Sequence, residues 1–187
     1  DSRDSLFIPG LHPKLMTLWA ESKDKRPGEV YEDSGCARCV AGPAVHQDMH
    51  DFLKDYGITP IKTHKQEEFI FGNSEVEISD CSFQYPVFLN GILRGSVDIA
   101  RIKAPRPALW SKRMMKEWGH VLDFDRQATF INHFNLKYPF KNTVPILDIF
   151  QMPTQLPTSE IPPCFRSDPH DVCFTSTEGI QKTEATS

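Results

Sequence analysis

Alternating apolar and polar residues in the middle of the chain predict a series of β-hairpins. Phe69 and Phe71 alternate with other residues before positions 72–75, and Val76 and Ile78 do so after them. Positions 72–75 read Gly-Asn-Ser-Glu, and turn-forming residues between two alternating segments are typical of a hairpin tip. The sequence therefore predicts a hairpin here, with Gly-Asn at its tip.

Two more hairpins and a final strand are predicted further along. Residues 83–102 form the second predicted hairpin, because every other position of its first strand is apolar and Asn90-Gly91 supplies a tight turn. Residues 121–131 form the third. Residues 134–140 keep a strict period of two, which predicts an edge or terminal strand with one buried face.

Two stretches show helical spacing instead. Residues 43–56 place five apolar side chains on one helical face, and Gly57 stands where a left-handed C-cap would fall. Ser111 is predicted to cap a shorter helix that runs through Trp118 and ends at Gly119. The predicted fold class is therefore all-β with one or two short helices.

Composition divides the chain into three segments. Residues 28–150 hold the predicted strands and form the predicted domain. Residues 1–27 are predicted to be an N-terminal arm with a short helix that starts near Pro13. Residues 151–187 contain five prolines and ten serine or threonine residues, and their apolar residues show no period. Because proline removes a backbone donor and fixes φ, this segment is predicted to be a flexible tail.

Composition and charge exclude several classes of function. The chain has 187 residues, with 21 Lys and Arg against 25 Asp and Glu, so its net charge is −4 and nucleic acid is not an expected partner. Hydrophobic residues make up 39%, including 13 phenylalanines, which is enough apolar surface for a folded domain. No apolar run approaches the ~18–20 residues that cross a bilayer, and the first ten residues lack the features of a signal peptide. Five cysteines are an odd number and too sparse for a disulfide scaffold, so we expect an intracellular, cytoplasmic location and no membrane partner.

The tripeptide Asp33-Ser34-Gly35 is the first candidate for chemistry. A carboxyl on a turn, beside a small hydroxyl residue and a glycine that lets two backbones approach, suits an acid that must meet another acid. On its own the tripeptide also fits an ordinary surface turn. The predicted hairpin and then the apolar pair Leu109-Trp110, just before the capped helix, follow it in order.

Taken together, these segments resemble the retropepsin-like aspartic peptidases, and most closely those carried by retrotransposons. That family has an Asp-Ser/Thr-Gly-Cys opening, a Phe-x-Phe-Gly hairpin and an ending in which Ser, Arg, Trp-Gly and Asp-Phe stand at fixed spacing. In this chain the opening lies at 33–36, the hairpin motif at 69–72 and the ending at 109–124. The resemblance covers about residues 30–131.

The resemblance implies a closed barrel that contributes one half of an active site. The chain contains one Asp-Ser-Gly, so the site would be completed when two copies form a homodimer. Asp33 would be the catalytic acid and base, Ser34 would brace the two loops across the dimer, and Gly35 would permit their close approach. Two carboxyls within ~3 Å share one proton and activate a water molecule between them. The implied activity is an endopeptidase that cleaves a polyprotein, with no cofactor and no metal.

The resemblance also implies how the substrate is held. Phe71, Gly72 and Asn73 would lie on a flap that closes over an extended peptide and adds main-chain hydrogen bonds. A second loop would support the catalytic loop, and its residues are Leu109, Trp110 and Ser111. The expected location is the cytoplasm or a retroelement particle.

Two residues depart from the family pattern. Tyr31 and Glu32 stand where the family usually has apolar side chains, so Glu32 is expected to face solvent or to raise the pKa of a neighbour. This departure favours an alternative function, in which a catalytically inactive or host-adopted copy of the same fold binds peptides or acts as a scaffold.

A further alternative is a small zinc-binding module. Its four ligands would be Cys36, Cys39, His46 and His50. Six residues separate Cys39 from His46, against ~12 in a Cys2His2 finger, and the two histidines share a polar helical face, which favours solvated histidines. Among the basic residues, Arg106 is interpreted as an edge-strand or loop charge.

Overall fold

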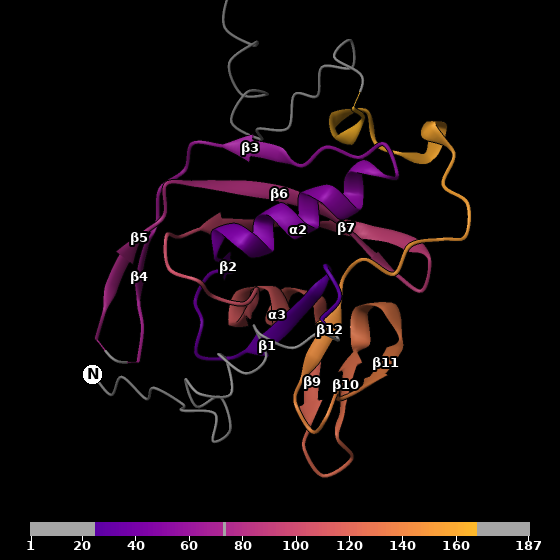
Figure 1. Ribbon diagram of the computed structural model, residues 1–187. Helices are drawn as coiled ribbons and strands as arrows, with labels where there is room; N and C mark the ends of the chain where they lie inside the picture. The colour runs from indigo at the N-terminus through magenta and orange to yellow at the C-terminus, as the bar shows by residue number, and fades with distance from the viewer. Residues whose placement is uncertain (1–24, 73, 168–187) are drawn as a thin grey trace, which may run out of the picture.

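The computed structural model describes residues 25–72 and 74–167, which fold mainly into β-strands (Figure 1). The strands are β1 (Glu29–Asp33), β2 (Val40–Ala41), β3 (Ile61–Thr63), β4 (Glu68–Ile70), β5 (Val76–Ile78), β6 (Cys81–Leu89), β7 (Ile92–Arg101), β8 (Leu109–Ser111), β9 (His120–Asp123), β10 (Ala128–Ile131), β11 (Leu136–Pro139) and β12 (Ile146–Asp148). They form a seven-stranded sheet in the order β12-β1-β8-β2-β7-β6-β3, a three-stranded sheet β11-β10-β9, and the hairpin β4–β5. The all-β expectation is therefore confirmed at the level of class.

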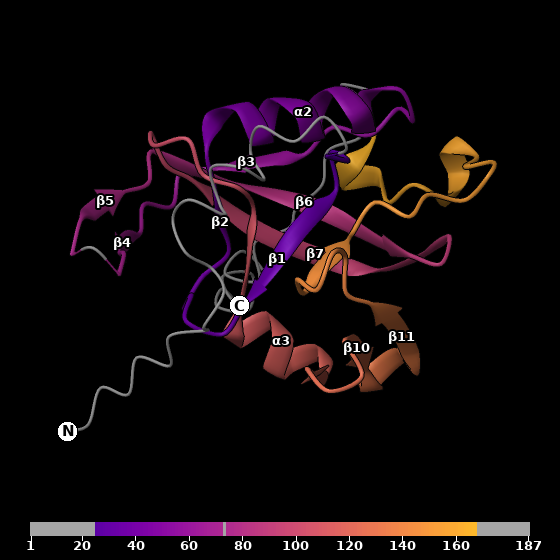
Figure 2. The same cartoon turned by 60° about the horizontal axis from the view of Figure 1, so that its bottom comes forward.

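In the described part of the chain, two short α-helices accompany these sheets, as predicted. They are α2 (Pro43–Lys54) and α3 (Lys112–Trp118), and three 3₁₀ turns cover Asn132–Phe134, Thr158–Glu160 and Pro163–Phe165. Ser111 caps α3 by accepting a hydrogen bond from the Met114 backbone N–H at 3.3 Å, and Gly119 ends the helix in the left-handed region at φ 68°. Figure 2 shows α2 along one side of the large sheet and α3 toward the other.

The three predicted hairpins are confirmed, but the closed barrel is not. Strands β4 and β5, β6 and β7, and β9 and β10 pair in antiparallel fashion. The large sheet has two free edges, β12 and β3, each three residues long. The chain after β12 makes one isolated bridge to β6, between Phe150 and Phe88. Because a single bridge does not extend into a ladder, the described part of the sheet stays open, and the prediction of a closed barrel is wrong for it.

The main core lies between α2 and the strands beneath it. The buried α2 residues Val45, Met49 and Leu53 follow the predicted apolar face. Phe52 stacks on Phe150 with ring centroids 5.6 Å apart, which joins the helix to the chain that follows β12. Burial of these large side chains supplies most of the stability that a domain of this size needs.

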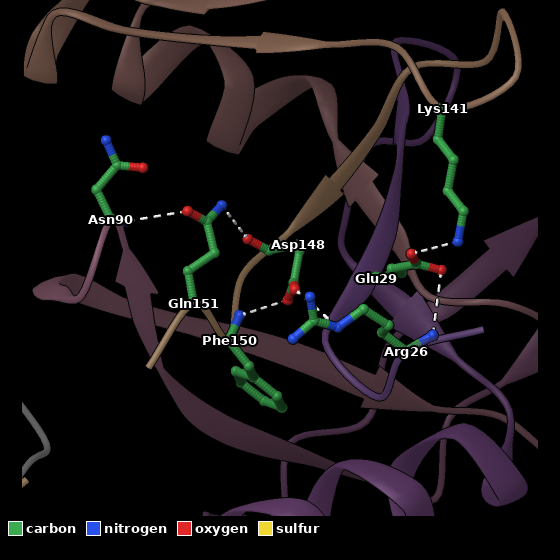
Figure 3. Close-up of polar contacts among 7 residues, drawn as sticks. All are labelled: Arg26, Glu29, Asn90, Lys141, Asp148, Phe150 and Gln151. Atoms are coloured by element: carbon green, nitrogen blue, oxygen red, sulfur yellow. Dashed lines mark hydrogen bonds and ion pairs between the residues drawn. The ribbon is translucent and has the colours of Figure 1, made fainter. Parts of the chain in front are cut away.

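Polar contacts fix the beginning of β1 beside β12 (Figure 3). Lys141 Nζ lies 2.6 Å from the Glu29 carboxyl, and Arg26 Nε lies 3.5 Å from Asp148. Asp148 also accepts a hydrogen bond from the Phe150 backbone N–H at 2.9 Å. Burial raises the pKa of Asp148, while Arg26 and Lys141 oppose that rise. These contacts hold the strand that leads to Asp33 at the end opposite the candidate site.

The first part of the segment predicted to be a flexible tail belongs to the folded domain instead. Residues 151–167 pack onto the domain, with Ile161 and Phe165 inside its main core. The Thr59 backbone N–H donates to the Phe165 carbonyl at 2.8 Å, and Ile58 forms a bridge with Arg166. The boundary at 151 is therefore wrong, because buried apolar contacts hold proline-rich chain without any periodic pattern.

The remaining terminal predictions fall on other parts of the chain. The predicted arm helix near Pro13, and the predicted tail from residue 168 onward, lie outside the described residues. Among residues 25–72 and 74–167, no helix has the length and apolar character needed to cross a membrane.

Replacing Phe165 with alanine tests whether this late segment belongs to the core. Phe165 is 4% exposed, so we expect Phe165→Ala to lower the free energy of unfolding by about 3–5 kcal/mol in urea denaturation. Phe124 is 53% exposed, and Phe124→Ala is the matched control, with an expected loss below about 1 kcal/mol. Equal losses for the two variants would mean that residue 165 lies in a tail after all.

Candidate active site

Strands β1 and β8 bring the predicted catalytic and supporting segments together. They run parallel, with Asp33 opposite Ser111 and Glu32 opposite Trp110. Tyr31 is opposite Leu109, so the strands stay paired over the three residues before the loop. Asp33, the last residue of β1, therefore lies beside Ser111, the N-cap residue of α3.

The loop after Asp33 is a tight turn that folds back on the carboxyl. The Gly35 backbone N–H donates to Asp33 Oδ1 at 2.8 Å, and the Cys36 backbone N–H donates to the Asp33 carbonyl at 3.1 Å. Burial raises the pKa of Asp33, although the backbone N–H groups of Gly35 and Cys36 oppose the rise. Ser34 is half-buried and Gly35 is exposed. A carboxyl that binds its proton more tightly than usual is suited to sharing one with another acid.

Ser111 and Cys39 fasten this loop to helix α3. The Cys39 thiol donates to Ser111 Oγ at 3.5 Å, and the Ser111 backbone N–H donates to the Cys39 sulfur at 3.3 Å. The Lys112 backbone N–H also donates to the Cys36 carbonyl at 2.9 Å. Cys36 and Cys39 are thus both bonded to the junction of β8 and α3, the segment predicted to support the loop.

The predicted flap hairpin packs over the strand that leads to Asp33. Phe69 is buried and Phe71 is half-buried, and their rings stack with centroids 6.4 Å apart. They belong to a second apolar cluster with Tyr31 and Leu109. Gly72 is exposed, and Asn73 lies outside the described residues. The hairpin thus presents its aromatic face to the candidate site.

Arg106 holds the same hairpin from the loop before β8. Its guanidinium carbon lies 3.8 Å from the centre of the Phe71 ring, and its Nη2 lies 3.6 Å from carboxylate oxygens of both Glu75 and Glu77. The Ala104 backbone N–H also donates to Glu77 at 3.2 Å. Arg106 does lie in a loop, as interpreted, but its charge is also bound to the β4–β5 hairpin. The hairpin motif gave no sign of this contact, because the contact joins segments that are far apart in the chain.

Glu32 faces the interior, so the first of the two expectations for it, a solvent-facing side chain, is wrong. Its carboxyl accepts a hydrogen bond from Thr129 Oγ1 at 2.5 Å and is hydrogen-bonded to His120 Nδ1 at 2.5 Å. The side chains of Glu32 and His120 have no exposed surface. An acidic residue inside a buried strand signals a buried partner, but only the packing of β1 against distant strands identifies which residue that is.

The four proposed zinc ligands are used in other ways. His46 lies on the buried side of α2, where Nδ1 is hydrogen-bonded to the Tyr85 hydroxyl and Nε2 to the Ala100 carbonyl. His50 packs edge-on against Phe83, with ring centroids 4.6 Å apart. The prediction of solvated histidines is therefore wrong for His46, because the sheet beneath α2 supplies polar partners for its ring.

Cys36 and Cys39 are also poor metal ligands, because their thiols hold their protons tightly. Burial raises the pKa of the Cys36 thiol to about 12, and burial raises that of Cys39 as well, whereas a metal needs the thiolate. Within residues 25–72 and 74–167, no three His, Cys, Asp or Glu side chains gather so as to hold a metal ion.

Among the clefts on the surface of the described chain, two are lined by charged side chains. One, of about 370 Å³, is lined by Lys25 and by acidic residues of α2. The other, of about 280 Å³, lies beside Ser111 and is lined mainly by polar residues, including Arg38 and Asp98. Asp33 lines neither of them.

Comparison with known proteins adds no family assignment. A scan against protein-family models and a search of curated proteins both give no match. The functional argument therefore rests on the motifs of this chain and on the arrangement of its residues around Asp33.

The buried His46 predicts that the fold loses stability in acid. Burial lowers its pKa to about 4, against about 6.5 in an unfolded chain. Between these values the unfolded chain binds more protons, so the free energy of unfolding falls as pH falls from about 6.5 to 4, by about 3 kcal/mol from this residue. Urea denaturation across this range measures the loss.

Two histidine variants identify the source of this pH dependence. His46→Gln keeps a polar side chain that does not titrate, so its stability should depend much less on pH. His133 is exposed, and His133→Gln should keep the wild-type slope. An unchanged slope in His46→Gln would show that other groups cause the acid sensitivity.

Proposed function

We propose that this chain is a retropepsin-like aspartic endopeptidase of the retroelement type that acts as a homodimer on extended peptides or a polyprotein. The observation that carries the proposal is the half-buried Asp33 carboxyl at the end of β1, beside the β8–α3 junction. The parallel pairing of β1 with β8, and of β2 with β7, supports a retropepsin-like arrangement around this loop. The exposed Gly35 beside Asp33 would permit the close approach of a second copy.

In the proposed dimer, two Asp33 carboxyls share one proton. The ionised carboxylate takes a proton from water while the oxygen of that water attacks the scissile carbonyl carbon. The protonated carboxyl donates its proton to the carbonyl oxygen, which gives a tetrahedral diol without free charge. The diol then collapses as a proton passes to the leaving amine, and the carbon–nitrogen bond breaks. The raised pKa of Asp33 supports this role, because one of the two carboxyls must keep its proton at mildly acidic pH.

The hairpin β4–β5 would cover the bound peptide. Its backbone can add hydrogen bonds to an extended chain, and closure over the site excludes water from the reacting atoms. The contacts of Phe71 and Arg106 support a hairpin that is already held close to the catalytic loop. We therefore infer that substrate enters between the hairpin and the end of β1.

Replacement of Asp33 with asparagine is the direct test. Asparagine has nearly the same shape but cannot exchange the proton, so Asp33→Asn should lower kcat for peptide cleavage by at least about 10²–10⁴-fold. The assay is run at pH ~4–6, where a carboxyl pair holds one proton. The mass of the protein in solution is measured in parallel, and we expect a dimer for both wild type and variant.

An exposed acid provides the matched control. Asp125 lies at the tip of the β9–β10 hairpin, and Asp125→Asn should cleave at the wild-type rate. Wild-type cleavage by Asp33→Asn would contradict the proposal. A monomeric wild type that cleaves nothing would favour the non-catalytic, peptide-binding module instead.

A further inference from the structure

A buried side-chain network lies directly behind Asp33. Glu32 precedes Asp33 in β1, and both oxygens of its carboxyl are hydrogen-bonded at 2.5 Å, one to His120 Nδ1 and the other to Thr129 Oγ1. His120 belongs to β9 and Thr129 to β10, which pair with each other. The His120 ring also stacks on Trp110, the residue opposite Glu32 in β8, with centroids 6.1 Å apart. The Glu32 carboxyl therefore joins β1 to both β9 and β10.

These hydrogen bonds are directional, unlike the packing of the apolar side chain that the retropepsin-like family usually has at position 32. An apolar side chain fills space but tolerates small slides and rotations of its strand. A fully buried carboxyl must keep its hydrogen bonds, because a buried oxygen without a partner is costly. Since both oxygens of Glu32 are engaged, β1 cannot rotate or slide at this point without breaking one of these bonds.

The position of Glu32 transmits this constraint to Asp33. Successive side chains of a strand point to opposite faces, so holding Glu32 toward β9 and β10 holds Asp33 toward the other face. On that face, Asp33 Oδ1 accepts a hydrogen bond from the Gly35 backbone N–H. We propose that Glu32, His120 and Thr129 form a positioning network that sets the direction of the Asp33 carboxyl. As a statement about catalysis, this inference rests on the proposed function.

Such a role has a kinetic signature. A misplacement of ~1 Å at a reacting group costs on the order of 100-fold in rate, whereas peptide binding by the hairpin and apolar cluster does not involve Glu32. We therefore expect Glu32→Gln to lower kcat by about 10–100-fold with little change in KM. Thr129→Val, which removes the hydroxyl donor, should have the same effect, and Thr129→Ser should restore activity.

Glu29 provides a matched control on the same strand. It is also buried, at 5% exposure, and its carboxyl is paired with Lys141 Nζ at 2.6 Å. Glu29→Gln therefore removes a buried, paired carboxyl from β1 at the end away from Asp33. It should lower the thermal midpoint as Glu32→Gln does, while kcat measured below that midpoint stays within about twofold of wild type.

A second readout does not require cleavage. The carboxyl carbon of Asp33, labelled with ¹³C, is followed by NMR through an acid titration. If Glu32 sets the surroundings of Asp33, the chemical shift and titration midpoint of this carbon change in Glu32→Gln and in Thr129→Val. They should stay at the wild-type values in Glu29→Gln.

The outcomes separate this inference from the proposed function. If Asp33→Asn abolishes cleavage but Glu32→Gln matches Glu29→Gln in kcat and in the Asp33 titration, the peptidase proposal stands and the positioning network is refuted. If the wild type does not cleave, the peptidase proposal fails, and the NMR titration decides the network alone. An Asp33 signal that responds to Glu32→Gln supports the network in that case, and an unchanged signal refutes it.

Discussion

The parallel pairing of β1 with β8 is the constraint on which the candidate site depends. It places Asp33 opposite Ser111, and Ser111 in turn caps α3 and contacts the Cys39 thiol. The loop between Asp33 and Cys39 is thereby closed at both ends by one short segment from much later in the chain. Without this pairing the Asp-Ser-Gly turn would be an ordinary exposed loop, because its own hydrogen bonds are local.

Polar contacts at both ends of β1 add to this pairing. Glu29 is paired with Lys141 where the strand begins, and Glu32 is bonded to His120 and Thr129 near its end. Buried ionisable groups rarely contribute more stability than apolar side chains of the same size. They do impose direction, and the bonds of Glu32 hold the end of β1 that carries Asp33 against β9 and β10.

The sequence predicts the local features of this fold well and its long-range contacts poorly. The hairpins, the cap at Ser111 and the turn at Gly119 depend on neighbouring residues, so periodicity and turn chemistry identify them. The open sheet, the buried late segment around Phe165 and the interior position of His46 depend on pairings between distant strands. The same holds for the site: Asp33 and Ser111 carry recognisable motifs, whereas Arg106, His120 and Thr129 become evident only once the strands are paired.

The central claim is that two copies of this chain bring their Asp33 carboxyls together. A crystal structure of the dimer with a non-cleavable peptide bound measures this most directly. The account predicts a two-fold axis between the two β1 strands, with oxygens of the two carboxyls within ~3 Å and the peptide under both hairpins. A dimer that leaves these carboxyls far apart, with the peptide bound elsewhere, would contradict it.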